Sequence, residues 1–543
     1  MPHTSIQHTR LRAPLLFALL FAGLVALHAG LLRLPYFWDE AGYYVPAARD
    51  LLLTGSLIPQ STPSNAHPPL VMAYLALCWK IAGYAPIVTR VSMLLIAAFS
   101  LLGVFRLAQR IANTEVAVAS ALCTALYPVF FAQSSLAQVD LAAAGLTFWA
   151  LLAYVEDRRG MAVIYFSLAA LAKETAILVP AALLLWECIT GGLPAVAKTL
   201  SRREAAEDPR VPFSFAKSAL LAVPAIPLAL WYTYHRGRTG FIFGNPEFFR
   251  YNVQATMHPL RILLALLMRL WQVVGYMNLY PLTLAALAAM WLPAQRDQGP
   301  GKDQERPRIT LDIQFAFLAV IVTYVLAMAV IGGAVLARYM LPAVPLVIIV
   351  CVSTLWRRVR WWRAVVALAL AAFVGALFVN PPYGFSPEEN LAYRDYIVLH
   401  QRAETFLETS YPMARILTAW PASAEISQPS LGYVTRPMRV LQIDNFTVGE
   451  MMSAADLRAK FDVALVFSTK YEPPHSSLQN WRAWQRIKTE YFGYHRDVPP
   501  AAAAQLLGGR LVYTDSRNGQ WVGVIEMEQV QEARSGRLVV ESP

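Results

Sequence analysis

Charge is scarce in this chain. Asp, Glu, Lys and Arg together make up 15% of its 543 residues, whereas 57% of the residues are hydrophobic. A soluble domain averages roughly 25% charged residues. This deficit excludes an ordinary soluble enzyme, and the long apolar runs that recur along the chain indicate a protein that crosses a membrane many times.

Cysteine is rare as well. The four cysteines, Cys78, Cys123, Cys188 and Cys351, all lie in apolar segments, and none is part of a CxxC motif. Neither a disulfide framework nor a cysteine-based metal site is expected from this spacing.

The charge that is present has a net value of +11. A basic protein can bind nucleic acid, but here Arg and Lys fall in short loops between apolar runs, as the positive-inside rule predicts for cytoplasmic loops. We therefore expect a membrane partner and no nucleic acid. The basic loops that we assign to the cytoplasm are 106–110, 158–159, 198–210, 296–308 and 357–363.

A bilayer-crossing helix needs about 20 apolar residues, and about eleven segments qualify or come close. They are 12–32, 87–106, 115–133, 139–156, 161–173, 175–190, 213–234, 273–292, 312–332, 337–356 and 364–380. The first follows Arg10 and Arg12 but lacks a small-x-small cleavage site, so we expect a retained anchor. The shorter run 68–83 would turn several basic loops outward if it crossed, so we expect a juxtamembrane helix there.

This count predicts an all-α polytopic membrane domain over residues 1–380, with a cytoplasmic N-terminus and a first external loop at 33–86. We place it in the inner (plasma) membrane. Residues 381–543 are polar and predict a small external α/β domain. Strand-like runs occur at 415–420, 463–468, 511–514 and 521–527, and helical patterns at 387–408 and 477–491.

The acidic dipeptide Asp39–Glu40 follows the first apolar segment. A carboxylate where a membrane helix meets water is costly to desolvate, which makes it a candidate for chemistry. In the predicted topology, further polar residues at helix ends face the same external side. They are His67, Arg90, Asp140, Lys173, Glu174 and Arg338.

Structural roles are the alternative for these residues. The alternatives are helix capping for Asp39, Glu40 and Asp140, shaping of a proline turn for His67, snorkelling or pairing with Glu174 for Lys173, and interface anchoring for Arg338.

The order of these motifs resembles the GT-C class of membrane glycosyltransferases, and most closely the protein O-mannosyltransferase and lipid A aminoarabinose transferase relatives. The likeness covers about residues 30–180. The residues that carry it are Asp39-Glu40-Ala-Gly-Tyr-Tyr44, Arg49, Gly55, His67-Pro-Pro-Leu70, Asp140 and Lys173-Glu174. Two features depart from relatives. Ala66–His67 stands where many have Glu-Lys, and Arg363 follows Trp361–Trp362 where oligosaccharyltransferases have Asp.

The resemblance implies an enzyme that moves a sugar from a polyprenyl-phosphate donor to a lipid, glycan or protein acceptor at the external face, with inversion. It implies that Asp39 is the general base, because the acceptor hydroxyl must lose a proton as it attacks, and that Asp140 helps to form the donor site. We expect Glu40 and Asp140 to belong to the catalytic residues with Asp39. Cationic side chains would stabilise the departing phosphate, and the candidates for donor binding are His67, Lys173, Arg338 and Arg90. No metal ligand set is visible, although the external acids leave a divalent cation possible.

Other functions compete with this one. A transporter or flippase of a lipid-linked substrate would place polar groups near the bilayer midplane, whereas the acids here lie at predicted helix ends. A polysaccharide ligase would also work externally, but that class tends to depend on arginines and a histidine in a large external loop. A scaffold role would not account for Asp39 and Asp140 on one face.

Overall fold

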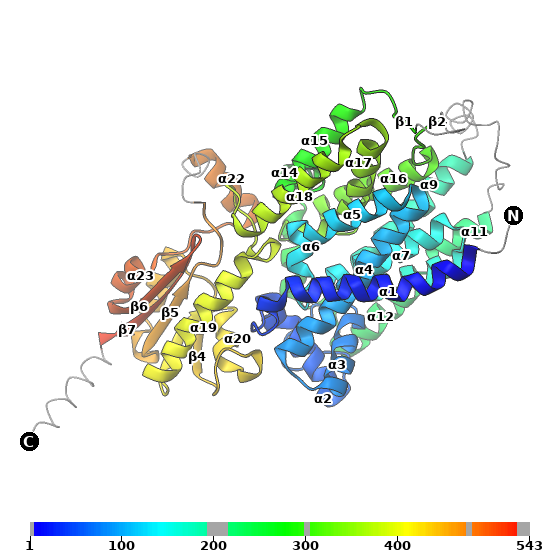
Figure 1. The fold of residues 1–543 in the computed structure, drawn as a ribbon. Coiled ribbons are helices and arrows are strands. Elements are labelled where there is room, and N and C mark those ends of the chain that lie inside the picture. The colour runs from blue at the N-terminus through cyan, green and yellow to red at the C-terminus, as the bar shows by residue number, and fades with distance from the viewer. Residues whose placement is uncertain (1–4, 193–214, 298–303, 474–480, 529–543) are drawn as a thin grey trace, which may run out of the picture.

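The computed structural model describes residues 5–192, 215–297, 304–473 and 481–528. A long helical bundle occupies most of the chain, and a mixed β-sheet with its own helices lies beyond one end of the bundle (Figure 1). The general fold class predicted from the sequence, a helical membrane protein with a small α/β unit, agrees with this architecture. In the described residues, three helices are long and apolar enough to cross a membrane: Pro86–Ile111, Pro259–Asn278 and Leu311–Val330.

Seven further apolar helices are shorter, at 10–17 residues each, so the predicted count of about eleven spans is not confirmed. The helices of the bundle, besides α4 (Pro86–Ile111) and α16 (Leu311–Val330), are α1 (Ser5–Leu27), α2 (Val45–Thr54), α3 (Leu70–Ala82), α5 (Thr114–Leu126), α6 (Pro128–Gln133), α7 (Asp140–Val155), α8 (Arg159–Ala172), α9 (Leu178–Gly192), α11 (Phe215–Ala219), α12 (Ala225–Thr239), α13 (Pro246–Asn252), α14 (Pro259–Val274), α15 (Tyr280–Ala289), α17 (Val344–Arg358) and α18 (Trp362–Phe378).

Two predicted spans have the wrong limits. The segment 115–133 is interrupted at Tyr127, because Pro128 lacks a backbone N–H and starts a separate short helix, α6. The predicted span 273–292 begins too late, since α14 already starts at Pro259, within the stretch 235–272 that we predicted as a loop between two spans. A left-handed residue, Met277 (φ 48°), then separates α14 from α15. The predicted basic loop 198–210 lies outside the described residues.

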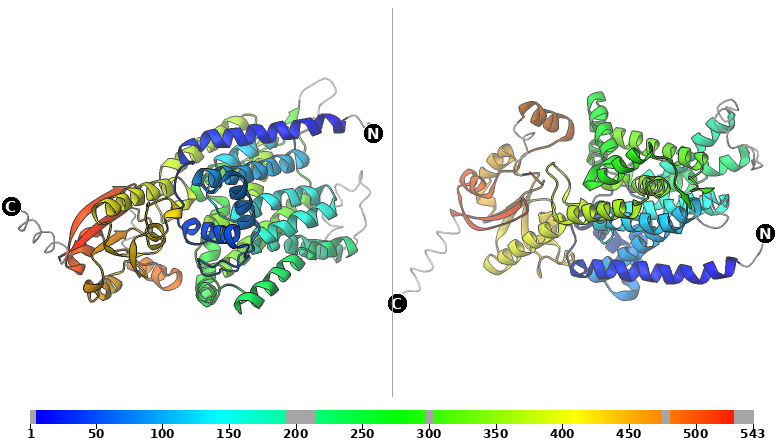
Figure 2. Two further views of the ribbon diagram at one scale, coloured as in Figure 1. Left: turned by 90° about the horizontal axis from the view of Figure 1, so that it is seen from below. Right: turned by 45° about the horizontal axis from the view of Figure 1, so that its top comes forward.

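The two ends of the bundle differ in character. The chain starts at the end away from the sheet, and three views agree on this arrangement (Figures 1 and 2). Basic loops meet at one place, where Arg363 pairs with Glu115 and Arg357 with Glu305. The short helix α3 packs against α2 and α4. Separation of the basic loops from the sheet is compatible with the predicted orientation, which stays a prediction.

The sheet has five strands in the order β4-β3-β5-β7-β6. The strands are β3 (Arg415–Ala419), β4 (Arg439–Ile443), β5 (Val463–Phe467), β6 (Gly509–Arg517) and β7 (Gln520–Met527). β3 runs parallel to β4 and β5, whereas β7 is antiparallel to β5 and β6. Four of these strands confirm the sequence prediction. β4 was missed because Arg439-Val-Leu-Gln-Ile443 is short and half polar.

Helices accompany the sheet: α19 (Ala392–Ser410), α20 (Ala422–Ser427), α21 (Val448–Ala455), α22 (Arg482–Phe492) and α23 (Pro500–Leu507). α19 corresponds to the predicted helix 387–408, although the first residues form a separate 3-10 turn, η8 (Pro387–Glu389). α22 corresponds to the later part of the predicted helix 477–491, whose first residues lie outside the described ones.

The first loop and the sheet region share one hydrophobic core. Tyr36 and Phe37 belong to the same buried cluster as Ile416 and Val463. The Tyr433 hydroxyl donates to the Tyr36 carbonyl at 2.9 Å, and Trp38 meets Trp420 edge to face at 5.2 Å. The predicted domain boundary at 380 coincides with the end of α18, but the core continues across it. The two regions therefore stabilise each other.

Gly42 offers a test of this shared core. A Cβ atom built on Gly42 would lie 2.5 Å from Cζ2 of Trp420, so Gly42→Ala must displace the indole. We expect a loss of about 1–3 kcal/mol in the free energy of unfolding, measured on the full-length protein in detergent. Gly160→Ala is the control, because nothing lies within 4 Å of its Cβ position. Equal stability of the two variants would contradict the close contact.

Candidate active site

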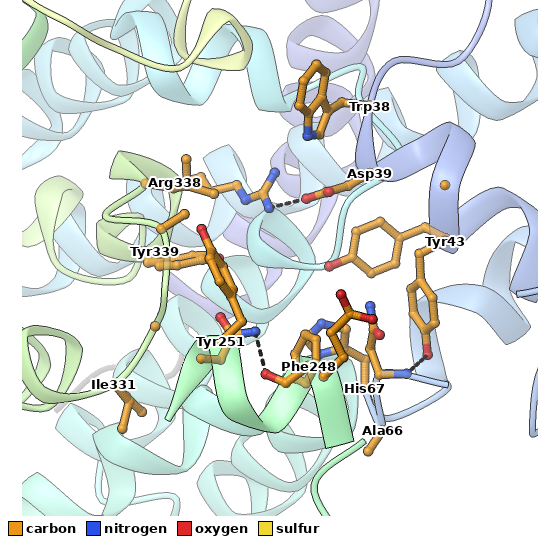
Figure 3. Close-up of a pocket in the computed structure, with 18 of the residues that line it drawn as sticks. Trp38, Asp39, Tyr43, Ala66, His67, Phe248, Tyr251, Ile331, Arg338 and Tyr339 are labelled. Carbon is orange, nitrogen blue, oxygen red and sulfur yellow. Dashed lines mark hydrogen bonds and ion pairs between the residues drawn. The ribbon is translucent and has the colours of Figure 1, made fainter. Parts of the chain in front are cut away.

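A cavity of about 1220 Å³ lies where the bundle meets the sheet region. Its wall combines segments that are far apart in sequence: the first loop, the α8–α9 junction, helix α13, the segment before α17 and the sheet region. Figure 3 shows labelled residues of the first loop, of α13 and of the segment before α17 around this cavity. The cavity has the size of a small-molecule site, and several of the predicted site residues line it.

Asp39 faces this cavity. It precedes a short π-helical turn, η2 (Glu40–Tyr44), and its side chain makes no capping hydrogen bond to that turn, so capping does not account for it. Its Oδ2 accepts a hydrogen bond from Arg338 Nη2 at 2.5 Å, as Figure 3 shows. The carboxylate is 31% exposed, which makes it accessible to a molecule in the cavity.

Arg338 connects several polar side chains of the site with one another. It lies in a 3-10 turn, η7 (Ala337–Met340), and is almost fully buried. Besides Asp39, its guanidinium donates to Gln138 and to Glu388, each at 2.5 Å, and its Nε lies 3.4 Å from Asp140 Oδ2. A buried guanidinium needs such compensation, since an uncompensated charge is costly to bury.

Asp140 forms an ion pair with Lys173. Asp140 is the first residue of α7, but its Oδ1 binds Lys173 and its Oδ2 accepts no hydrogen bond among the described residues, so helix capping does not account for it. Lys173 Nζ also lies 4.0 Å above the Tyr339 ring, a cation–π contact. Lys173 lines the cavity, and Asp140 lies behind it. Asp39 and Asp140 therefore approach each other through Arg338, not across open space.

His67 lies on another part of the wall. Its Nδ1 is 3.0 Å from Glu174 Oε2, and its ring packs against Tyr43, Tyr44 and Phe248. Although burial alone would raise the pKa of Glu174, the charge and hydrogen bond of His67, with Lys173 nearby, lower it to about 2. Glu174 thus pairs with His67 and not, as the alternative held, with Lys173.

Glu40 and Arg90 form a second, separate ion pair. Both are buried to 1% exposure or less, and neither lines the cavity. Arg90 contacts both carboxylate oxygens of Glu40 and donates to the carbonyls of Pro35 and Ser135 at 2.7 and 2.8 Å. Glu40 in turn accepts from the Phe37 amide at 2.8 Å. This geometry supports a structural role in place of the predicted catalytic and donor-binding ones.

Sequence reasoning missed several residues of the site. Glu388 and Gln138 bind Arg338, and the Tyr339 ring lines the cavity. Two arginines of α14, Arg261 and Arg269, lie buried behind the segment 328–336 and donate to its carbonyls. The sequence does contain a signal for these two residues, namely arginines within an apolar helical stretch. The signal was overlooked because residues 235–272 were predicted to form a loop.

Helix α13 covers one side of the cavity and is held at both of its ends. The Asn245 amide donates to the Ser64 carbonyl at 3.0 Å, and the Gly332 amide donates to the Asn252 carbonyl at 2.9 Å. Gly333 allows this approach, because a Cβ there would lie 2.3 Å from the Tyr251 ring. Helix α13 thereby bridges the first loop and the segment before η7 on this side of the cavity.

Burial raises the pKa of Glu388 to about 7, against the opposing effect of Arg338 and with a further increase from Asp39. Glu388 lies in η8, after the last apolar helix of the bundle. Its carboxyl group therefore changes charge close to neutral pH, next to the guanidinium that contacts Asp39.

The pH dependence of stability tests this shift. Between the ordinary value of 4.5 and about 7, folded Glu388 holds a proton that the unfolded chain has released, so stability falls as pH rises through this window. We expect Glu388→Gln to flatten that slope, read from melting temperatures between pH 4.5 and 8. Parallel curves for the variant and the parent protein would argue against the raised pKa.

Arg90 provides a separate test. Arg90→Ala would leave Glu40 buried and unpaired, and we expect a loss of roughly 3–5 kcal/mol in the free energy of unfolding. Arg363→Ala, which breaks an exposed pair with Glu115, should have little effect. A stable Arg90→Ala protein that fails to bind donor would instead favour the donor-binding role.

Part of the chain is similar to a known protein family. A family model described as dolichyl-phosphate-mannose-protein mannosyltransferase matches residues 66–200. The predicted resemblance to this class of membrane glycosyltransferases is confirmed over that stretch. No match was found among curated protein sequences.

Solved structures resemble the chain over most of its length. ArnT from Cupriavidus metallidurans, bound to undecaprenyl phosphate, is 12% identical with a TM-score of 0.49, and the match covers 93% of this chain and 97% of ArnT. The oligosaccharyltransferase of Archaeoglobus fulgidus in complex with Zn and sulfate is 13% identical with a TM-score of 0.43, over 83% of this chain and 67% of the other. The archaeal oligosaccharyltransferase AglB from the same organism, with an inhibitory peptide and a dolichol-phosphate, is 12% identical with a TM-score of 0.43, over 94% and 74%.

Proposed function

We propose that this protein is a glycosyltransferase that moves a sugar from a polyprenyl-phosphate donor to an acceptor, with Asp39 as the general base. The observation that carries the proposal is the placement of Asp39: a partly exposed carboxylate in a large cavity, held by a buried guanidinium. The family match over residues 66–200 supports the reaction class.

Asp39 has the features that a base in this reaction needs. Arg338 donates to Oδ2 and so fixes the orientation of the carboxylate, since a charge-assisted hydrogen bond is short and directional. Among the described residues, no hydrogen bond reaches the other oxygen, so it is free to accept the proton of an acceptor hydroxyl within hydrogen-bond reach.

The proposed reaction is a single displacement with inversion. The acceptor oxygen forms a bond to the anomeric carbon while its proton passes to Asp39. The bond between that carbon and the phosphate oxygen breaks, and its electron pair leaves with the polyprenyl phosphate. Negative charge then grows on the phosphate, and preorganised cations stabilise it in a site from which water is excluded.

Four cations surround the part of the cavity where that phosphate would lie. Lys173 and Arg338 line the wall but are already paired with carboxylates. Arg261 Nη1 and Arg269 Nη2 are buried without a hydrogen-bond partner, and within the described residues neither arginine has an acid at ion-pair distance. The Arg269 guanidinium lies 5.4 Å from the Tyr339 ring centre. We assign these two arginines as supporting charges for the phosphate, beside the predicted Lys173 and Arg338.

The sheet region supplies part of the same cavity. Trp420, Thr469 and Lys470 line it from the side opposite the bundle. Because the donor's lipid tail must stay with the bundle, this opposite wall suits the acceptor. In the predicted topology it lies outside the membrane, so the transfer would take place at the external face.

Replacement of the base tests the proposal. We expect Asp39→Asn to lower the transfer rate about 10²–10⁴-fold, because the amide cannot take the proton, while donor binding persists. Transfer is measured by mass spectrometry with a panel of polyprenyl-phosphate sugars, and donor binding by the shift in melting temperature. Glu247→Gln is the control, since Glu247 is an exposed acid of the same cavity on α13. Near-parental transfer by Asp39→Asn would refute the assignment.

A further inference from the structure

Three side chains that the proposed reaction does not use converge inside the sheet region. His400 and Glu404 lie one turn apart on α19, and Glu425 lies on α20. One donor atom from each lies within 4.8 Å of the others. All three side chains are buried to 2% exposure or less.

These groups lack the partners that buried polar atoms normally have. His400 Nδ1 lies 2.6 Å from Glu425 Oε2 and 3.5 Å from Glu404 Oε1. Both oxygens of Glu404, Oε1 of Glu425 and Nε2 of His400 have no hydrogen bond in the described residues. An unsatisfied buried polar atom costs roughly 1–3 kcal/mol, and more when it is charged. Four such unpartnered atoms in one place indicate that the site binds a ligand.

The surroundings supply no compensating charge. Around His400 the neighbours are aromatic: Tyr396 stacks on its ring at 3.9 Å, and Phe467 meets it edge to face at 4.6 Å. Within the described residues, no Lys or Arg lies at ion-pair distance from either carboxylate.

We propose that His400, Glu404 and Glu425 bind a divalent transition-metal ion, with Zn²⁺ as the ion to test. A neutral imidazole and two carboxylates balance a charge of +2. Zinc bonds of about 2.0–2.1 Å in a tetrahedral site separate ligand atoms by roughly 3.3 Å, a value between the 2.6 and 3.5 Å that separate His400 Nδ1 from the two carboxylates. The imidazole nitrogen argues against Mg²⁺ and Ca²⁺, which prefer oxygen ligands alone.

The metal would have a structural consequence at the cavity. It would tie α19 to α20, and α20 begins directly after Trp420 and Pro421. Trp420 contacts Trp38 and lies over Gly42, on either side of Asp39. The site therefore fixes one wall of the cavity without contact to a substrate. This inference does not depend on which group the enzyme transfers.

The metal content of the purified full-length protein tests the site. The protein is prepared with an affinity tag that contains no histidine, and its metals are counted by plasma mass spectrometry. We expect one zinc or related ion per chain, and at least about a tenfold lower content in the double variant Glu404→Gln/Glu425→Gln. His258→Ala, which removes an exposed histidine that packs on Tyr491, should keep the full content.

Reloading gives a second measurement that does not require the variants to fold. After chelator treatment, addition of equimolar ZnCl₂ should raise the melting temperature of the parent protein, whereas MgCl₂ should not. The proposal is overturned if the stripped parent protein takes up no zinc.

Discussion

The contact between Arg338 and Asp39 is the interaction on which the site depends. Arg338 is buried at the start of the segment that leads into α17, and it would be unstable there without acids around it. Asp39, Asp140 and Glu388 come from three distant parts of the chain and meet at this guanidinium. One cation thus fixes the relative positions of the first loop, the bundle and the start of the sheet region.

A second buried arginine, Arg90, fixes the first loop at Glu40, the residue that follows Asp39. Arg90 on α4 binds Glu40 and two loop carbonyls, so the segment that carries Asp39 is held from behind as well as from the cavity. The acidic dipeptide therefore divides its functions between its two members. Glu40 anchors the loop in the protein interior, whereas Asp39 is presented to the cavity with one oxygen unengaged.

The sheet region belongs to the same packed structure that holds the first loop. Its core is continuous with that of the first loop, and Trp420 packs against the turn that follows Asp39. Precise placement of reacting groups requires that their supports be packed and immobile. The proposed metal at His400, Glu404 and Glu425 would add a further constraint, because Glu425 lies on α20, the helix that begins two residues after that tryptophan.

The amino-acid sequence alone was sufficient for the membrane character, for most helices and four of the five strands, and for the choice of Asp39, His67, Lys173 and Arg338, which line one cavity. Apolar length and alternation are local properties, so they can be recognised in a linear sequence. The sequence could not distinguish the role of Asp39 from that of its neighbour Glu40, since both are acids in the same loop. Only tertiary contacts with Arg338 and Arg90 distinguish them.

The same limit explains the residues that were missed. Glu388, Gln138 and the arginines of α14 can be recognised as residues of the site only by their contacts with partners 50 to 200 residues away in the sequence. No local sequence pattern encodes contacts over such a separation. Likewise, His400 and Glu404 are ordinary positions of an amphipathic helix until Glu425 is folded against them. The sequence by itself determined which segments are apolar and helical and where acids stand at the ends of these segments. Which acid faces the cavity was decided by the tertiary structure, because burial and charge compensation are properties of the folded chain.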